Sequence, residues 1–238
     1  FQDKSSAKSF LFYCFVFFIA LLFRKPVYLI AQGVGPIDNS FFQFLLKILF
    51  RFVQKVSFRD ISSADFVENN RLLGSDLAFY REQLKGHEDS YQQIGIAMAP
   101  FRDILFIRTL LDECVQDPLY VICHAVKDDV LIAAKGVQKQ FLTDPKQLLP
   151  IQKLISMRFH ACVMASLQGI PFFAVGIDEK LIQLAKRLNQ PYIDCRDGLD
   201  KVGFELAIDH FLRFPVFLDP DLVQQAIDDA VVHEQVFV

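Results

Sequence analysis

The sequence lacks tryptophan, an excess of positive charge and any pair of closely spaced cysteines. Its 26 phenylalanines supply the bulky aromatic side chains instead, which indicates a phenylalanine-rich core. The 25 basic and 28 acidic side chains give a formal net charge of -3. Because no global positive field is present to hold a phosphate backbone, nucleic acid is not an expected partner.

The five cysteines are odd in number and widely scattered, at Cys14, Cys114, Cys123, Cys162 and Cys195. This pattern fits reduced thiols in a cytosolic protein and excludes a disulfide framework or a zinc site built on CxxC pairs. No histidines have the HExxH spacing, and neither GxSxG nor a Walker A motif occurs. We therefore expect no metal site and no cofactor.

The length of 238 residues allows one large domain or two small ones. A hydrophobic content of 53% with 22% charged residues excludes disordered and collagen-like classes. A chain this long buries a full core without disulfides or metals. It begins with Phe1 rather than methionine, within what looks like the middle of an element. We therefore expect an N-terminally truncated chain.

A run of 14 apolar residues extends from Phe10 to Phe23, with Lys8 before it and Arg24 and Lys25 after it. A membrane span needs about 20 apolar residues, and runs of about 10–14 are more often buried helices or signal-peptide cores. A signal peptide would end in small residues rather than in two basic ones. The favoured interpretation is a buried crossover helix, apolar on every side; membrane contact and a signal peptide stay open.

Strand-like and helix-like segments alternate along the rest of the chain, which predicts an α/β protein with parallel sheets and helices on both faces. The predicted strands cover residues 26–31, 55–58, 94–97, 119–123, 154–156, 172–177 and 192–194. The predicted helices cover residues 40–54, 61–69, 101–115, 126–140, 159–168, 181–188, 199–212 and 221–232.

A polar stretch over residues 80–92 is the best linker candidate, because it separates two series of alternating strands and helices. The sequence thus predicts two Rossmann-like lobes that face a cleft. We assign residues 1–85 to the remainder of an N-terminal lobe, residues 92–215 to a C-terminal lobe and residues 219–238 to a terminal helix.

Ligands of open parallel sheets bind beyond the carboxyl ends of the strands. Three predicted strand ends carry cationic or titratable side chains: Arg59 follows the first, Arg158 and His160 the second, and Lys180 the third. A cation in the first turn of a helix is disfavoured by about 0.3–1 kcal/mol, and a bound anion reverses that preference. The positions of Arg158 and Lys180 therefore indicate an anionic ligand.

Each of these residues also has a plainer interpretation. Arg59 can simply pair with Asp60 or a neighbouring carboxylate. His160 can be a hydrogen-bonded core residue, and Lys180 a solvated surface residue. The stretch 33–36 lacks the third glycine of a dinucleotide fingerprint and is a weak signal by itself.

Six motifs, in this order, resemble those of the polysaccharide pyruvyl transferase family. The most specific are QGVGPI, FRD with its following serine pair, and RFHA with a lysine about twenty positions later. The motifs are Gln2-Asp3 with Ser5-Ser6, Gln32 to Ile37, Phe58-Arg59-Asp60, Ser75 to Phe79, Met157 to Ala161, and Asp178-Glu179-Lys180.

The resemblance implies a two-lobed fold of the glycosyltransferase-B (GT-B) type and transfer of a pyruvyl group from phosphoenolpyruvate to sugar hydroxyls of a cell-surface polysaccharide, forming a pyruvate ketal. By motif, the family's arginine, histidine and lysine map onto Arg59, His160 and Lys180. We expect His160 to be the catalytic acid and base. Substrate binding is expected at Arg59, Arg158, Lys180, Gly33 and Gly35.

The expected acceptor is a lipid-linked glycan, and the expected location is the cytoplasm, at the inner face of the membrane if the apolar run touches lipid. Two other interpretations stay open. One is a nucleotide-sugar glycosyltransferase of the same fold, and the other is an inactive, truncated member that acts as an interaction protein.

Overall fold

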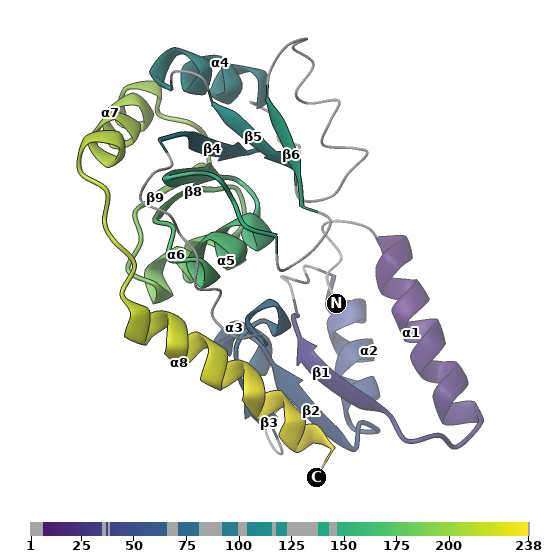
Figure 1. Ribbon diagram of the computed structural model, residues 1–238. Helices are drawn as coiled ribbons and strands as arrows, with labels where there is room; N and C mark the ends of the chain where they lie inside the picture. Colours follow the sequence, from purple (N-terminus) through teal and green to yellow (C-terminus); the bar gives the residue numbers. More distant parts are fainter. Residues whose placement is uncertain are drawn as a thin grey trace. The chain divides into compact units, whose positions relative to one another are not determined.

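A computed structural model of the protein describes residues 7–34, 37, 39–65, 71–80, 92–99, 104–115, 118–122, 138–142 and 147–237 (Figure 1). The chain divides into two compact units. One contains Phe1–Arg81 together with Gln225–Val238, and the other contains Glu82–Gln224. Residues 81–91, nearly all of the predicted linker, lie outside the described residues.

The first unit contains a parallel sheet of β1 (Tyr28–Gln32), β2 (Lys55–Phe58) and β3 (Arg71–Leu73), in that order. Helix α2 (Ser40–Phe50) connects β1 to β2, and its first amides are capped by the Asn39 side chain. The four-residue helix α3 (Ile61–Ala64) follows β2. The prediction of a strand, a helix and a second strand over this region is confirmed.

The apolar run over residues 10–23 was expected to form a buried helix. It does form a helix, α1 (Ala7–Leu22), but only one side of that helix is buried. One stripe, formed by Phe10, Cys14 and Phe17, packs into the core of the first unit. The remaining sides are about half to two-thirds exposed and stay apolar: Leu11, Phe12, Tyr13, Phe15, Val16, Phe18 and Leu22. The residue pattern showed only that α1 is apolar, whereas burial depends on neighbours from other elements. None of the described helices is both long and apolar enough to cross a membrane.

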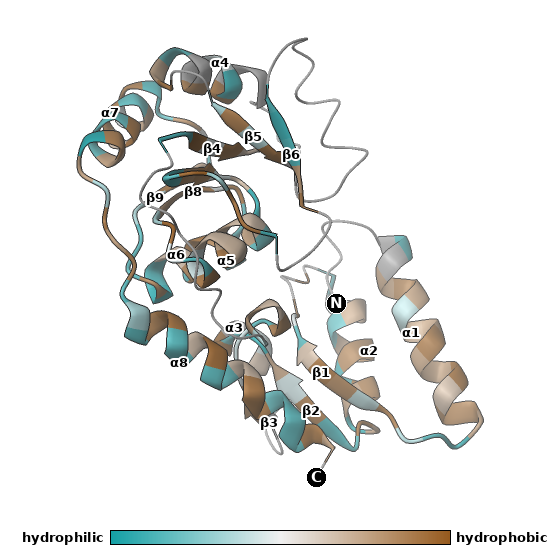
Figure 2. Ribbon diagram, viewed as in Figure 1, coloured by the Kyte–Doolittle hydropathy of each residue, from teal (hydrophilic) through white to brown (hydrophobic). Residues whose placement is uncertain are grey.

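The second unit contains a parallel sheet in the order β6-β5-β4-β7-β8-β9. Its strands are β4 (Ile94–Ala97), β5 (Leu119–Ile122), β6 (Lys139–Phe141), β7 (Lys153–Ser156), β8 (Phe172–Gly176) and β9 (Tyr192–Asp194). The order reverses next to β4, as in doubly wound folds. Every residue of β8, an inner strand paired on both sides, is buried, which explains its continuous apolar sequence (Figure 2).

Helices cover both faces of this sheet, as predicted (Figure 1). They are α4 (Ile104–Cys114), α5 (Phe159–Leu167), α6 (Glu179–Arg187) and α7 (Lys201–Arg213). Helices α4 and α7 pack against each other and share a core with β4, β7 and β8, in which Ile107, Phe173 and Phe204 are fully buried. The α/β architecture with parallel sheets is confirmed.

Two strands differ from the predictions. The strand β3 was not predicted, and β6 occupies residues 139–141, where a helix over 126–140 was expected. The rest of that predicted helix, up to residue 137, lies outside the described residues. Both strands have three residues and a partner on one side only, so their side chains do not need the apolar pattern by which a central strand is recognised.

The C-terminal segment consists of α8 (Pro220–Val231) and the 3₁₀ helix η3 (Val232–Val236). A terminal helix was predicted over residues 221–232. From residue 225 onwards this segment belongs to the first unit, where η3 packs against β1, β2 and β3. Ala226 and His233 are buried there. The end of the sequence therefore completes the unit formed by its beginning.

Gly176, at the end of β8, allows a test of the packing in the second unit. A Cβ atom there would lie 2.5 Å from the Ile182 side chain and 3.0 Å from the Ile193 carbonyl oxygen. We expect Gly176→Ala to destabilise the protein by about 1–3 kcal/mol because the core is overpacked. Thermal unfolding measures this effect. Val202→Ala, at an exposed position of α7, is the control, and equal melting temperatures for the two variants would refute the described packing.

Candidate functional site

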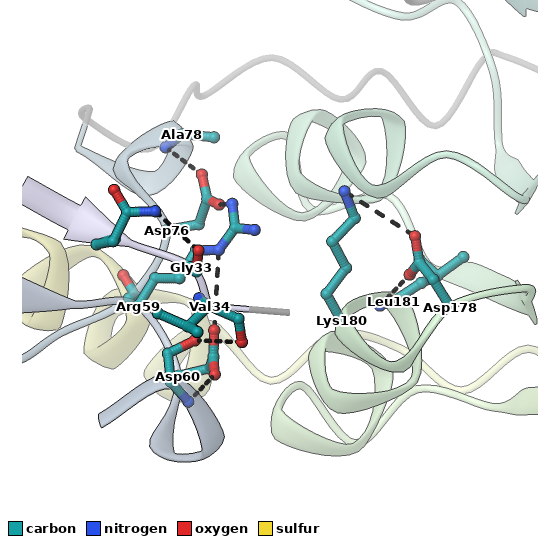
Figure 3. Close-up of polar contacts among 12 residues, drawn as sticks. Gly33, Val34, Arg59, Asp60, Asp76, Ala78, Asp178, Lys180 and Leu181 are labelled. Carbon is teal, nitrogen blue, oxygen red and sulfur yellow. Dashed lines mark hydrogen bonds and ion pairs between the residues drawn. The ribbon is translucent and has the colours of Figure 1, made fainter. Parts of the chain in front are cut away.

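Gly33 and Arg59 lie side by side in the first unit, because each follows one of the paired parallel strands β1 and β2. A Cβ atom on Gly33 would lie 2.6 Å from both Nε and Nη2 of Arg59. Glycine at position 33 therefore allows the observed approach of the guanidinium, which any larger residue would force to move. The structure thus brings these two predicted residues together (Figure 3). The predicted Gly35 lies outside the described residues.

Two carboxylates hold the Arg59 guanidinium. Its Nη1 donates to Asp76 Oδ2 at 2.7 Å, and its Nε lies 3.8 Å from Asp60 Oδ2. The expectation that Arg59 pairs with a carboxylate is confirmed, with Asp76 as the close partner. About one third of the Arg59 side chain remains exposed. The residue is therefore both fixed in place and accessible to an anion.

The serine that follows the FRD motif fastens the loop after β1. Ser63 Oγ accepts a hydrogen bond from Val34 N at 2.7 Å and lies 3.3 Å from the Val34 carbonyl oxygen. Asp60 in turn caps α3 by accepting from Ser63 N at 2.8 Å. Ala31, just before this loop, has a φ of 46°, which non-glycine residues rarely adopt. These contacts hold the backbone of residues 33 and 34 against α3.

In the second unit, the predicted residues follow β7 and β8, which are also neighbours. Arg158 is the N-cap residue of α5, and its Nε donates to the Met98 carbonyl oxygen at 3.0 Å. His160 lies in the first turn of α5 and is exposed, so the alternative of a buried core histidine is wrong. Lys180 lies in the first turn of α6.

His160 and Lys180 both contact the ring of Phe159. The two ring centroids of Phe159 and His160 are 5.6 Å apart in an edge-on arrangement, and Lys180 Nζ lies 5.5 Å from the Phe159 centroid. A cation over an aromatic face is stabilised by about 0.5–1 kcal/mol at an exposed site. Asp178 Oδ2, 3.9 Å from the Lys180 ammonium group, partly neutralises its charge (Figure 3). The structure therefore brings His160 and Lys180 to one sheet edge.

Arg196 is a further cation at this edge that the sequence analysis did not single out. It follows β9, so the same signal, a basic residue after a predicted strand, would have found it. Its guanidinium hydrogen-bonds to Asp194, with Nη2 2.6 Å from Oδ2, and forms an ion pair with Glu179. These hydrogen bonds lower the pKa of Asp194 below its usual value and raise that of Arg196. Glu179, the neighbour of Lys180, is thereby tied to the end of β9.

No metal or thiol site accompanies these groups in the described part of the chain. None of its histidine, cysteine and acidic side chains form a group of three suited to a metal ion. Four cysteines, at positions 14, 114, 162 and 195, are unbridged. Burial raises the pKa of the Cys14 and Cys114 thiols, so both favour the protonated, unreactive form.

The model of the polysaccharide pyruvyl transferase family matches residues 1–139. No curated protein sequence matches the chain. Arg59 and Gly33 lie inside the matched range, whereas Arg158, His160 and Lys180 lie beyond it and are assigned by the motif resemblance alone.

Solved structures show the fold. HepE (Alr3699) of Anabaena in complex with UDP has a TM-score of 0.55 at 14% identity, over 94% of this chain and 71% of that one. A putative UDP-N-acetylglucosamine 2-epimerase of Listeria monocytogenes has a TM-score of 0.51 at 8% identity, over 93% and 68%. The GtfA/B complex has a TM-score of 0.52 at 9% identity, over 93% and 51%. The fold is of the GT-B type.

The Asp194–Arg196 pair predicts a dependence of stability on pH. Because the pKa of Asp194 is lowered in the folded state, its carboxylate stabilises the fold above the unfolded value of 3.8 and loses that effect as the pH falls through the folded value. We expect Asp194→Asn to lower the unfolding free energy by at most about 1 kcal/mol near neutral pH, since the pair is solvent-exposed. The difference from wild type should shrink on acidification.

Urea unfolding at a series of pH values measures this difference. Asp197→Asn, at an exposed position of the same loop, is the matched control. A gap between wild type and Asp194→Asn that stays constant down to about pH 3 would refute the pair's contribution.

Proposed function

The chain belongs to the polysaccharide pyruvyl transferase family, and from that premise we propose that it transfers the pyruvyl group of phosphoenolpyruvate to two hydroxyls of a glycan acceptor. Both hydroxyl oxygens bond to the central carbon, and the carbon–oxygen bond to phosphate breaks. Of the two hydroxyl protons, one ends on the methylene carbon and the other on the departing phosphate. The products are a pyruvate ketal and inorganic phosphate.

One observation supports this proposal most directly: Arg59 is accessible yet fixed against Gly33 at the end of the paired strands β1 and β2. Phosphoenolpyruvate carries a carboxylate and a phosphate, both of which arginine binds in a bidentate manner. In the second unit, Arg158 and Lys180 provide further positive charge at a strand edge. We assign these three residues to substrate binding.

We assign the proton transfers to His160. Imidazole ordinarily titrates near neutrality and can both donate and accept a proton. His160 is exposed in the first turn of α5, beside the Phe159 ring that Lys180 also contacts. In the proposed reaction, His160 removes the proton of the attacking hydroxyl or protonates the methylene carbon, while Lys180 stabilises the negative charge of the leaving phosphate.

A nucleotide-sugar glycosyltransferase is the second candidate function. It is favoured by the structural likeness to HepE, of which solved complexes contain UDP and also UDP with glucose. Thermal unfolding with each ligand separates the two candidates. A ligand at 100 times its dissociation constant stabilises a protein by about 2.7 kcal/mol. Stabilisation by phosphoenolpyruvate supports the pyruvyl transferase, and stabilisation by UDP alone supports the glycosyltransferase.

The catalytic assignment predicts that His160→Ala loses phosphate release from phosphoenolpyruvate in the presence of a lipid-linked glycan acceptor. General acid–base catalysis contributes about 10²–10⁴-fold, so the rate should fall by at least about 100-fold. His210→Ala, at an exposed position of α7, is the matched control and should retain the wild-type rate. Wild-type phosphate release by His160→Ala would refute the role of this histidine.

The exposed apolar side of α1 supports a location at the inner face of the membrane, where the proposed lipid-linked acceptor would lie. Residues 7–58 contain six basic residues and one acidic residue, whereas the chain as a whole is negative. Lys8, Arg24 and Lys25 flank the apolar side. Such a surface, apolar and bordered by cations, suits a bilayer that contains anionic lipids. Since the opposite stripe of α1 is packed into the protein core, we propose that the helix lies along the bilayer surface.

Vesicles that contain anionic phospholipid should therefore co-sediment with the protein, and vesicles of neutral lipid should do so less. The triple variant Phe12→Ser, Phe15→Ser, Phe18→Ser should lose this binding, because all three side chains are more than half exposed. Leu206→Ser, at an exposed position of α7, is the control. Equal binding of the triple variant, or loss of a dimer rather than of vesicle binding, would contradict a lipid-facing role.

A further inference from the structure

The contacts of Asp76 point to a role that its motif does not reveal. We propose that Asp76 is a positioning residue for Arg59, and that the C-terminal segment of the chain, residues 225–237, holds Asp76 in place. The proposal concerns the first unit alone. It rests on the proposed function only for the identity of the anion that Arg59 binds.

The two oxygens of Asp76 have separate partners. Oδ2 accepts the hydrogen bond from Arg59 Nη1, and Oδ1 accepts one from Ala78 N at 3.0 Å as the cap of the 3₁₀ helix η1 (Leu77–Phe79). The side chain is only 12% exposed. A carboxylate anchored to the backbone through one oxygen has a fixed direction, so it also fixes the guanidinium bound to the other oxygen.

Asp76 contacts one side of the Arg59 guanidinium, through Nη1. The Nε and Nη2 atoms form the edge that grips carboxylates and phosphates with two parallel hydrogen bonds. A Cβ atom on Gly33 would lie 2.6 Å from both atoms, so this edge faces the Gly33 backbone, and Asp60 Oδ2 lies 3.8 Å from Nε. Asp76 binds Nη1 instead. It therefore orients the guanidinium toward the Gly33 backbone, while about one third of the Arg59 side chain stays exposed to a ligand.

The C-terminal segment holds the two residues that precede Asp76. Ser75 N donates to the Asp229 carbonyl oxygen at 3.3 Å, and Ser75 Oγ donates to the Ala226 carbonyl oxygen. His233 Nε2 lies 2.6 Å from the Ser75 carbonyl oxygen, which can only accept, so this nitrogen carries the proton. A Cβ atom on Gly74 would lie 2.5 Å from the Asp229 carbonyl oxygen. The backbone here is enclosed by α8 and η3.

A further contact lies on the other side of Asp76. The Tyr80 hydroxyl, just after η1, donates to Glu234 of η3, and this hydrogen bond raises the pKa of Tyr80. The segment 74–80 is therefore attached to the C-terminal segment both before and after Asp76. The C-terminal segment, more than 150 positions later in the sequence, thus holds Asp76, the partner of Arg59, in place.

The affinity for phosphoenolpyruvate tests the proposal, because the two possible roles of Asp76 predict opposite changes in affinity for Asp76→Asn. If Asp76 were only a negative charge near the site, Asp76→Asn would tighten binding of an anion by removing repulsion. A positioning role predicts the opposite: Asp76→Asn, which keeps the shape and a capping oxygen, should weaken binding about tenfold in calorimetry. In an Arg59→Lys background, which lacks the bidentate edge, the same substitution should have little further effect. Tighter binding, or equal weakening in both backgrounds, would overturn the proposal.

The Arg59 side chain can also be observed without any ligand. In wild type, its Nε–H resonance, assigned by its loss in Arg59→Lys, should show restricted rotation of the guanidinium, and Asp76→Asn should abolish that restriction. An unchanged resonance would refute positioning even if the protein bound no phosphoenolpyruvate. Absence of binding to wild type with the restriction intact would instead count against the proposed function alone.

Ser75→Ala tests the contribution of the C-terminal segment, because it removes the hydrogen bond to Ala226 without touching Arg59. We expect the affinity for phosphoenolpyruvate to fall about threefold and the rotation of the Arg59 guanidinium to become partly unrestricted. Gly74→Ala should have a stronger effect in the same direction, with its melting temperature recorded to separate local displacement from unfolding. Wild-type binding and a wild-type Arg59 resonance in a folded Gly74→Ala variant would show that the C-terminal segment does not hold Asp76.

Discussion

Parallel pairing of β1 with β2, and of β7 with β8, is the constraint on which the candidate site depends. It brings the carboxyl ends of neighbouring strands to one edge, so side chains far apart in sequence become neighbours. Arg59 meets the backbone of Gly33 in this way, and Lys180 meets the ring of Phe159 beside His160. Strand pairing therefore decides which side chains can act together in each unit.

Positive charge at these edges is held in place by neighbouring groups that leave part of each cation exposed. Asp76 fixes Arg59 through Nη1, the Met98 carbonyl oxygen receives Arg158, and Phe159 lies under Lys180. A carboxylate, a carbonyl group and an aromatic face all stabilise a cation, yet each leaves part of it able to meet an anion. This shared feature supports the proposed anionic substrate.

Much of the fold was predictable because buried central strands have continuous apolar sequences. The strands at residues 94–97 and 172–176 were found by that pattern within a residue or so. The short edge strands β3 and β6 lacked this apolar pattern.

For the candidate site, the rule of a basic residue after a predicted strand led to Arg59, Arg158 and Lys180. The same rule would have included Arg196. The pairing of Asp76 with Arg59 was not predicted, because it spans seventeen positions and needs β2 and η1 to be adjacent.

The sequence by itself determined the alternation of strands and helices, the family resemblance and the cationic side chains at the strand ends, since all of these depend on local order along the chain. Tertiary structure alone decided which sides of α1 are exposed, which carboxylate holds Arg59 and that residues 225–237 join the first unit. The reason is physical: burial and ion pairing depend on atoms brought close by folding, and their separation along the chain does not specify that proximity.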